Sequence, residues 1–168
     1  LSGQGGGAGG GVAGGPGSSF GGAGSSFGGA TGLSRLFGSE MGAEISWLLP
    51  AALVALAAGL WVTRRAGRTD RTRSALVLWG GWLVVSGLVF SYMQGIVHPY
   101  YTVALAPAIA GLVGTGAHAL WVRHDAFTAR AGLAAMVASA ASWSIVLLNR
   151  VPTWYPELRY AIGILGFV

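Results

Sequence analysis

The feature that most constrains this chain is a series of apolar runs, each long enough to cross a lipid bilayer as a helix. Complete runs cover residues 45–62, 75–93, 102–121 and 131–148, and another begins at residue 160. A helix needs about 20 mostly apolar residues to cross a hydrocarbon core of roughly 30 Å. Because unpaired backbone N–H and C=O groups are costly in lipid, such runs form helices. The sequence therefore predicts an all-α fold, a polytopic bundle of transmembrane helices.

Composition supports this prediction and excludes several classes of function. The 168 residues are 53% hydrophobic and 9% charged, with a mean hydropathy of +0.61, which is too apolar for a typical soluble domain. The ten basic residues are all Arg, and in a membrane protein they face anionic headgroups, so we expect no nucleic-acid binding. The chain has no Cys, which excludes disulfides and thiolate metal sites. No metal-ligand cluster or cofactor motif occurs in the sequence, so we assign no metal ligands in this chain and expect no cofactor.

Residues 1–32 are dominated by Gly, Ala and Ser, and the unit GSSFGGA occurs twice in succession. Such a segment buries too little surface to offset the entropy of ordering its backbone. We therefore predict a flexible loop over residues 1–32 and a transmembrane region over residues 33–168. Within the latter, residues 33–44 suit a short interfacial helix with Leu36 and Met41 on the apolar face and Arg35 outside it.

The arginines predict which loops face the cytoplasm. The short loop at residues 63–73 carries five arginines against one acid, Asp70, and loops of this kind stay on the cytoplasmic side. Alternation of the spans then places the Gly-rich segment, the turn around His98 and the loop before residue 160 on the extracytoplasmic side. We expect a multi-pass protein of the plasma membrane, surrounded by membrane lipids. Because the chain starts without Met and stops inside an apolar run, we also expect it to be part of a longer protein.

The most informative local sequence precedes the third run, where polar and aromatic residues gather: Gln94, His98, Pro99, Tyr100 and Tyr101. Pro is favoured in the first turn of a helix. The positive end of the helix dipole and the free N–H groups of that turn would then favour an anionic phosphate at headgroup depth. The alternative is that the tyrosines form an interfacial belt and that His98 is a polar cap.

Two further groups of residues bear on function. Arg150 and Arg159 lie on the predicted outer side, where they could bind a phosphate or a sugar, although snorkelling to headgroups explains them equally well. His118, late in the third run, is better explained by helix packing or by the interface than by proton transfer. The apolar runs contain no Asp, Glu, Lys or Arg, which argues against an ion pump or a proton-coupled transporter.

The segment FSYMQGIVHPYYTVALAPAIAGLVGTG, residues 90–116, closely resembles the actinobacterial membrane glycosyltransferases of family 39. These are relatives of protein O-mannosyltransferases and of the aminoarabinose transferase that modifies lipid A. The resemblance extends over residues 32–56 and 70–95 and to the Gly-rich segment, and HPYYTVALAP is its most specific part.

This resemblance implies a GT-C fold and transfer of a sugar from a polyprenyl-phosphate carrier to an extracytoplasmic acceptor. It places His98, Pro99, Tyr100 and Tyr101 near the lipid carrier. We add Gln94 and Arg150 as further candidates for binding the lipid-phosphate donor. The family's catalytic carboxylate lies far upstream, in the first extracytoplasmic loop, so no catalytic residue is assigned here. The remaining N-terminal part of the parent protein would be an essential partner. Without the resemblance, a transporter subunit or a membrane scaffold would explain the same spans.

Overall fold

The computed structural model describes residues 29–67, 69–95, 97–153 and 155–167. Most of the Gly-rich segment predicted to be a flexible loop therefore lies outside the described residues. Helices and short 3-10 helices follow one another in this order: η1 Leu33–Phe37, α1 Ser39–Ile45, η2 Ser46–Leu48, α2 Leu49–Val62, α3 Arg71–Tyr92, η3 Pro99–Leu105, α4 Ala106–Trp121, α5 Phe127–Asn149 and α6 Pro156–Phe167. The described part of the chain contains no strand, which confirms the all-α prediction.

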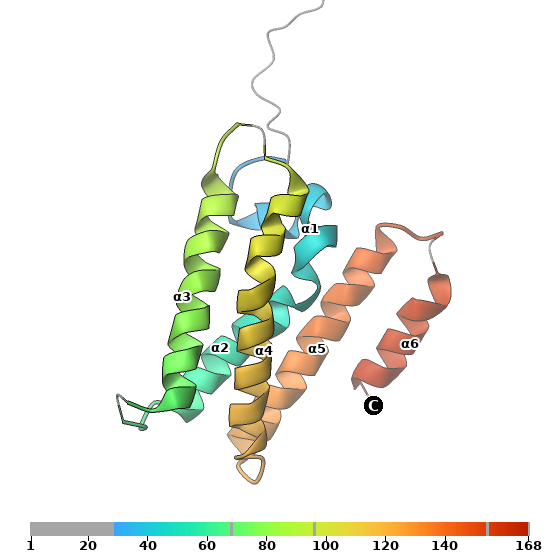
Figure 1. Ribbon diagram of the computed structural model, residues 1–168. Coiled ribbons are helices and arrows are strands. Elements are labelled where there is room, and N and C mark those ends of the chain that lie inside the picture. The colour runs from blue at the N-terminus through green and yellow to red at the C-terminus, as the bar shows by residue number, and fades with distance from the viewer. Residues whose placement is uncertain (1–28, 68, 96, 154, 168) are drawn as a thin grey trace, which may run out of the picture.

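Four helical segments are long and apolar enough to cross a membrane: Ser39–Val62, Arg71–Tyr92, Pro99–Trp121 and Phe127–Asn149. They run up and down side by side, and α6 packs along α5 (Figure 1). The loops after α2 and α4 lie at one end of the bundle, called here the arginine-rich end. The loops after α3 and α5 lie at the other, called here the HPYY end. This alternation is the one that the apolar runs require.

The helical segments begin earlier in the sequence than the apolar runs that predict them. α3 starts at Arg71 because the side chain of Asp70 accepts a hydrogen bond from the backbone N–H of Arg73 at 2.7 Å, which satisfies a donor of the first turn. Polar residues thus extend the helix by one turn beyond the apolar run. A hydrophobic pattern marks where lipid begins, whereas the cap marks where the helix begins.

The segment before the first span differs from the single interfacial helix expected over residues 33–44. Extended backbone at Gly38 separates η1 from α1, and α1 continues through η2 into α2. Arg35, which we expected outside the apolar face, is only 3% exposed. The expectation is wrong because the guanidinium finds backbone acceptors at the end of α3, which the local sequence does not reveal.

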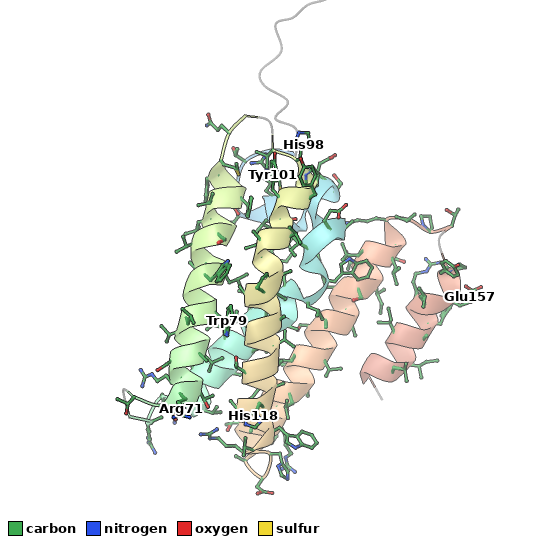
Figure 2. All side chains as sticks on the ribbon, in the orientation of Figure 1. Arg71, Trp79, His98, Tyr101, His118 and Glu157 are labelled. Atoms are coloured by element: carbon green, nitrogen blue, oxygen red, sulfur yellow. The ribbon has the colours of Figure 1, made fainter. Side chains whose placement is uncertain are left out.

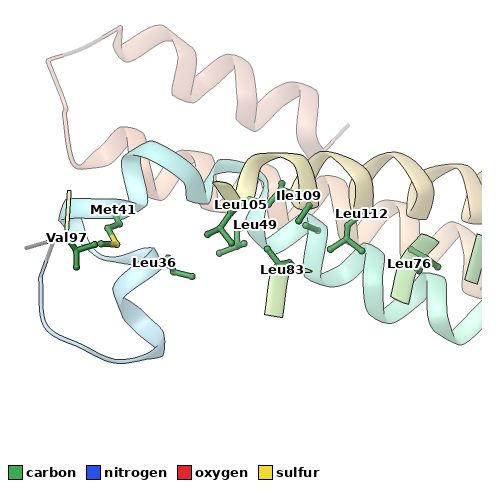
Figure 3. Close-up of a cluster of buried hydrophobic side chains, with 11 residues drawn as sticks. Leu36, Met41, Leu49, Leu76, Leu83, Val97, Leu105, Ile109 and Leu112 are labelled. Carbon is green, nitrogen blue, oxygen red and sulfur yellow. The ribbon is translucent and has the colours of Figure 1, made fainter. Parts of the chain in front are cut away.

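The bundle packs through small residues, as in other membrane proteins. A Cβ on Gly116 of α4 would lie 2.7 Å from the Cβ of Ala55 in α2, and one on Gly80 of α3 would lie 2.7 Å from Leu56. Towards the HPYY end, the core contains Met41, Leu49, Val97, Leu105 and Ile109 (Figure 3). This core lies beneath the turn that carries the candidate site.

Candidate functional site

The candidate site is the turn that joins α3 to η3. Helix α3 ends with Met93 as its C-cap residue, and Gly95 has a φ of +96°, a backbone conformation that residues with a Cβ rarely adopt. Val97 then enters the core and is fully buried beside Met41. The turn is therefore held from below by an apolar anchor directly before His98, which is itself exposed.

The sequence after His98 explains why a 3-10 helix precedes α4. Thr102 and Leu105 are buried and three residues apart, which matches the three residues per turn of a 3-10 helix. The Thr102 hydroxyl donates to the carbonyl of Pro99 at 2.6 Å. With these two side chains turned inward, Tyr100 and Tyr101 remain exposed.

Three aromatic rings meet at this end of the bundle. His98 stacks on Tyr100 with ring centroids 5.3 Å apart, and it meets Tyr101 edge to face at 5.8 Å. The two tyrosine rings lie 4.6 Å apart. Figure 2 shows His98 and Tyr101 at the tip of the bundle, opposite Arg71 and His118. The structure thus brings together three of the side chains that the sequence singled out.

The first turn of η3 offers fewer backbone donors than we expected. Pro99 has no N–H, and the N–H of Tyr101 donates to the carbonyl of His98 at 3.1 Å. His98 occupies the N-cap position, but its side chain makes no capping hydrogen bond. Binding of an anion here would therefore depend mainly on the imidazole and the tyrosine hydroxyls.

Arg35 supports the turn from the side, a role that sequence reasoning missed. Its Nη1 donates to the carbonyls of Met93 at 2.7 Å and Phe90 at 3.3 Å. These carbonyls belong to the last turn of α3 and its cap, where the helix dipole favours a cation. Nearby, the N–H of Gly32 donates to the carbonyl of Ser91 at 2.8 Å. The sequence feature that could have indicated this role is an Arg inside the otherwise mostly apolar stretch LSRLF.

The remaining predicted residues take two different positions. Gln94 is exposed on the turn. Arg150, at the end of α5, donates to the carbonyls of Phe37 at 2.7 Å and Gly38 at 2.9 Å, and its Cζ lies 5.6 Å from the centre of the Trp143 ring. Arg150 therefore joins α5 to the η1–α1 junction. Within the described ranges, no group of three or more His, Asp or Glu side chains is arranged to hold a metal ion.

Comparison with known proteins finds two similar bacterial sequences. The chain is 33% identical over 138 residues to Putative mannosyltransferase YycA of Bacillus subtilis (strain 168), an alignment that covers 79% of this chain and 20% of that protein. It is 42% identical over 87 residues to Putative mannosyltransferase YkcB of the same organism, covering 49% of this chain and 12% of that protein. No family model matches the chain. No solved structure matches it either. The chain thus spans a fifth or less of the curated relatives that it resembles.

Proposed function

We propose that this chain is part of a membrane glycosyltransferase that transfers a sugar, with mannose the first to test, from a polyprenyl-phosphate carrier to an extracytoplasmic acceptor. The observation that carries the proposal is the similarity to two proteins named as mannosyltransferases, in a chain with four membrane-capable helices. Family 39 membership and the GT-C architecture are part of the same proposal.

The HPYY end suits the phosphate of such a carrier. His98 and both tyrosines are exposed at the end of a membrane-capable helix, and if that helix spans the bilayer they would lie at the depth of the lipid phosphates. The imidazole can donate a hydrogen bond to a phosphate oxygen, and the tyrosine rings offer faces against which a sugar can pack. Val97 below and Arg35 beside the turn hold this arrangement before the donor binds, which lowers the ordering cost of binding.

The remaining chemistry is proposed to come from elsewhere in the protein. Sugar transfer needs a base that accepts the proton of the acceptor hydroxyl, and no residue of this chain is assigned that role. We propose that an upstream extracytoplasmic loop supplies the carboxylate. In this arrangement the turn binds the donor, and the missing loop completes the active site.

The test is transfer of radiolabelled sugar from polyprenyl-phosphate donors in membranes that contain the full-length protein. His98→Ala should lower transfer about tenfold or more, consistent with loss of one interaction to a charged phosphate, while leaving expression and thermal stability unchanged. His124→Ala is the matched control, because His124 is an exposed histidine at the arginine-rich end. Equal transfer by both variants would remove His98 from the mechanism.

The orientation can be tested separately. The chain has no Cys, so, once any cysteine in the rest of the protein is replaced, Gln94→Cys introduces a single thiol at the HPYY end and Thr69→Cys does so at the arginine-rich end. A membrane-impermeant maleimide added to intact cells should label only the first. No transfer with any donor from well-folded protein, whatever the orientation, would favour the transporter or scaffold alternative.

A further inference from the structure

A second feature lies at the arginine-rich end, remote from the proposed donor site. A hollow of about 310 Å³ opens between the start of α3 and the end of α4, and its lining residues are Arg71, Thr72, Ala75, Gly114, Thr115 and His118. Figure 2 shows Arg71 and His118 at this end of the bundle. Both side chains are exposed, and they border the same hollow.

The hollow exists because small residues border it on both helices. In the middle of the bundle the two helices are close, since a Cβ on Gly111 would lie 2.6 Å from the ring of Trp79. One turn further along α4, a Cβ on Gly114 would have no heavy atom within 4 Å among the described residues outside its own helix. Ala75 opposite is also small. The floor of the hollow is therefore apolar and formed in part by small residues, against which an acyl chain can pack.

The rim of the hollow is polar and basic. Arg71 takes part in no ion pair with any carboxylate that the structure describes. The nearest acid in the sequence, Asp70, accepts the backbone N–H of Arg73. The hydroxyl of Thr115 donates to the carbonyl of Gly111 within α4, so Arg71 and His118 are the groups of the rim that can bind an anion. A ligand that complements this rim carries negative charge next to an apolar chain.

We propose that the hollow between α3 and α4 binds an anionic phospholipid, with the phosphate at Arg71 and His118 and the first part of an acyl chain over Ala75 and Gly114. Charge complementarity favours this occupant, because basic pockets between membrane helices attract anionic headgroups. The site is distinct from the proposed donor site, which lies at the other end of the bundle, and it does not depend on the sugar or the acceptor.

The experiment measures phosphatidylglycerol retained by the purified full-length protein in native mass spectrometry, after reconstitution in nanodiscs of equal parts phosphatidylglycerol and phosphatidylcholine. Arg71→Gln should reduce retained phosphatidylglycerol at least threefold. Gly114→Leu places an apolar side chain in the hollow, at a position where an added Cβ has no neighbour within 4 Å in the described part of the chain outside α4, and should do the same while leaving Arg71 in place. Arg130→Gln is the control, since Arg130 is exposed at the same end but lies outside the hollow.

A reduction in both Arg71→Gln and Gly114→Leu, with Arg130→Gln like the parent, would support the site. Equal retention in all four proteins would overturn it, as would an equal loss in Arg71→Gln and Arg130→Gln, which would indicate diffuse surface charge. Retention that falls in Arg71→Gln but not in Gly114→Leu would also contradict the proposal, because it would place the headgroup on the arginine without a chain in the hollow. Transfer activity is not the readout, so failure of the proposed function would leave this result interpretable.

Discussion

The two ends of the bundle use arginine in opposite ways. At the arginine-rich end, Arg64 lies exposed in the turn after α2, donates to the carbonyl of Trp61 in the last turn of that helix at 2.9 Å and lies over that tryptophan's ring. At the HPYY end, Arg35 is buried and donates to carbonyls of a different helix, 55 and 58 residues further along the chain. The first arrangement leaves the charge available to solvent and headgroups, whereas the second uses it to fix a turn. The same residue type therefore marks the membrane surface at one end and supports a candidate binding site at the other.

The largest change in stability should come from replacing Arg35, and Arg64 is replaced separately for comparison. Arg35→Met removes the side-chain donor of two part-buried hydrogen bonds, to the carbonyls of Phe90 and Met93, and we expect a loss of about 2 kcal/mol in the free energy of unfolding. Arg64→Met should cost about 0.5 kcal/mol, as is usual for exposed charge interactions. Equilibrium unfolding in mixed micelles measures both. Hydrogen exchange of the amides at residues 91–95 should rise only in Arg35→Met. Equal losses would break the distinction between the two ends.

A smaller loss of stability should come from replacing a glycine by alanine at each end of the bundle. A Cβ on Gly42 in α1 would lie 3.0 Å from the carbonyl group of Phe37 and 3.1 Å from Nη1 of Arg150. We expect Gly42→Ala to cost about 1 kcal/mol through overpacking. Gly67, in the loop after α2, has no such neighbour among the described residues, so Gly67→Ala should stay within about 0.5 kcal/mol of the parent. Equilibrium unfolding in mixed micelles measures the stability of both variants. A loss of stability in Gly67→Ala equal to that in Gly42→Ala would contradict the tight packing assigned to the HPYY end.

The smallest effect on stability should come from Arg150, because its hydrogen bonds to Phe37 and Gly38 are exposed. We expect Arg150→Gln to cost about 0.5 kcal/mol and Arg130→Gln, at the other end, to cost less. The KM for the donor, measured alongside stability, sharpens the role of Arg150. A raised KM with nearly unchanged stability would show that it contacts the donor as well as the backbone, whereas an unchanged KM would leave it a structural link between α5 and α1.

Much of the fold follows from the sequence because lipid imposes simple rules. Long apolar runs must be helical, and Arg-rich loops must avoid the hydrocarbon, so the helix count and the alternation of loops are readable without a structure. Gly80 and Gly111 also lie at close contacts, as small residues in membrane helices often do. Gly114 does not, because whether a small residue meets a neighbour depends on which side chains face it from other helices.

The candidate site was predictable in part for the same reason. His98, Tyr100 and Tyr101 are neighbours in sequence, so a short helical turn was bound to bring them together. Arg35 was not predictable, because its acceptors lie on α3 and become neighbours only after the bundle forms. The sequence predicted more free backbone N–H groups in the first turn than the structure has, because a 3-10 turn uses the N–H of Tyr101 in a hydrogen bond to the carbonyl of His98.

The most direct test of the central claim is to find which end of the bundle binds the sugar carrier. A photoreactive analogue of the polyprenyl-phosphate sugar is cross-linked to the full-length protein in membranes, and fragment mass spectrometry assigns the labelled residues. We expect labelling within residues 94–105 that excess unmodified donor displaces and excess phosphatidylglycerol does not. Donor-displaceable labelling confined to the arginine-rich end, or no displaceable labelling anywhere in this chain, would contradict it.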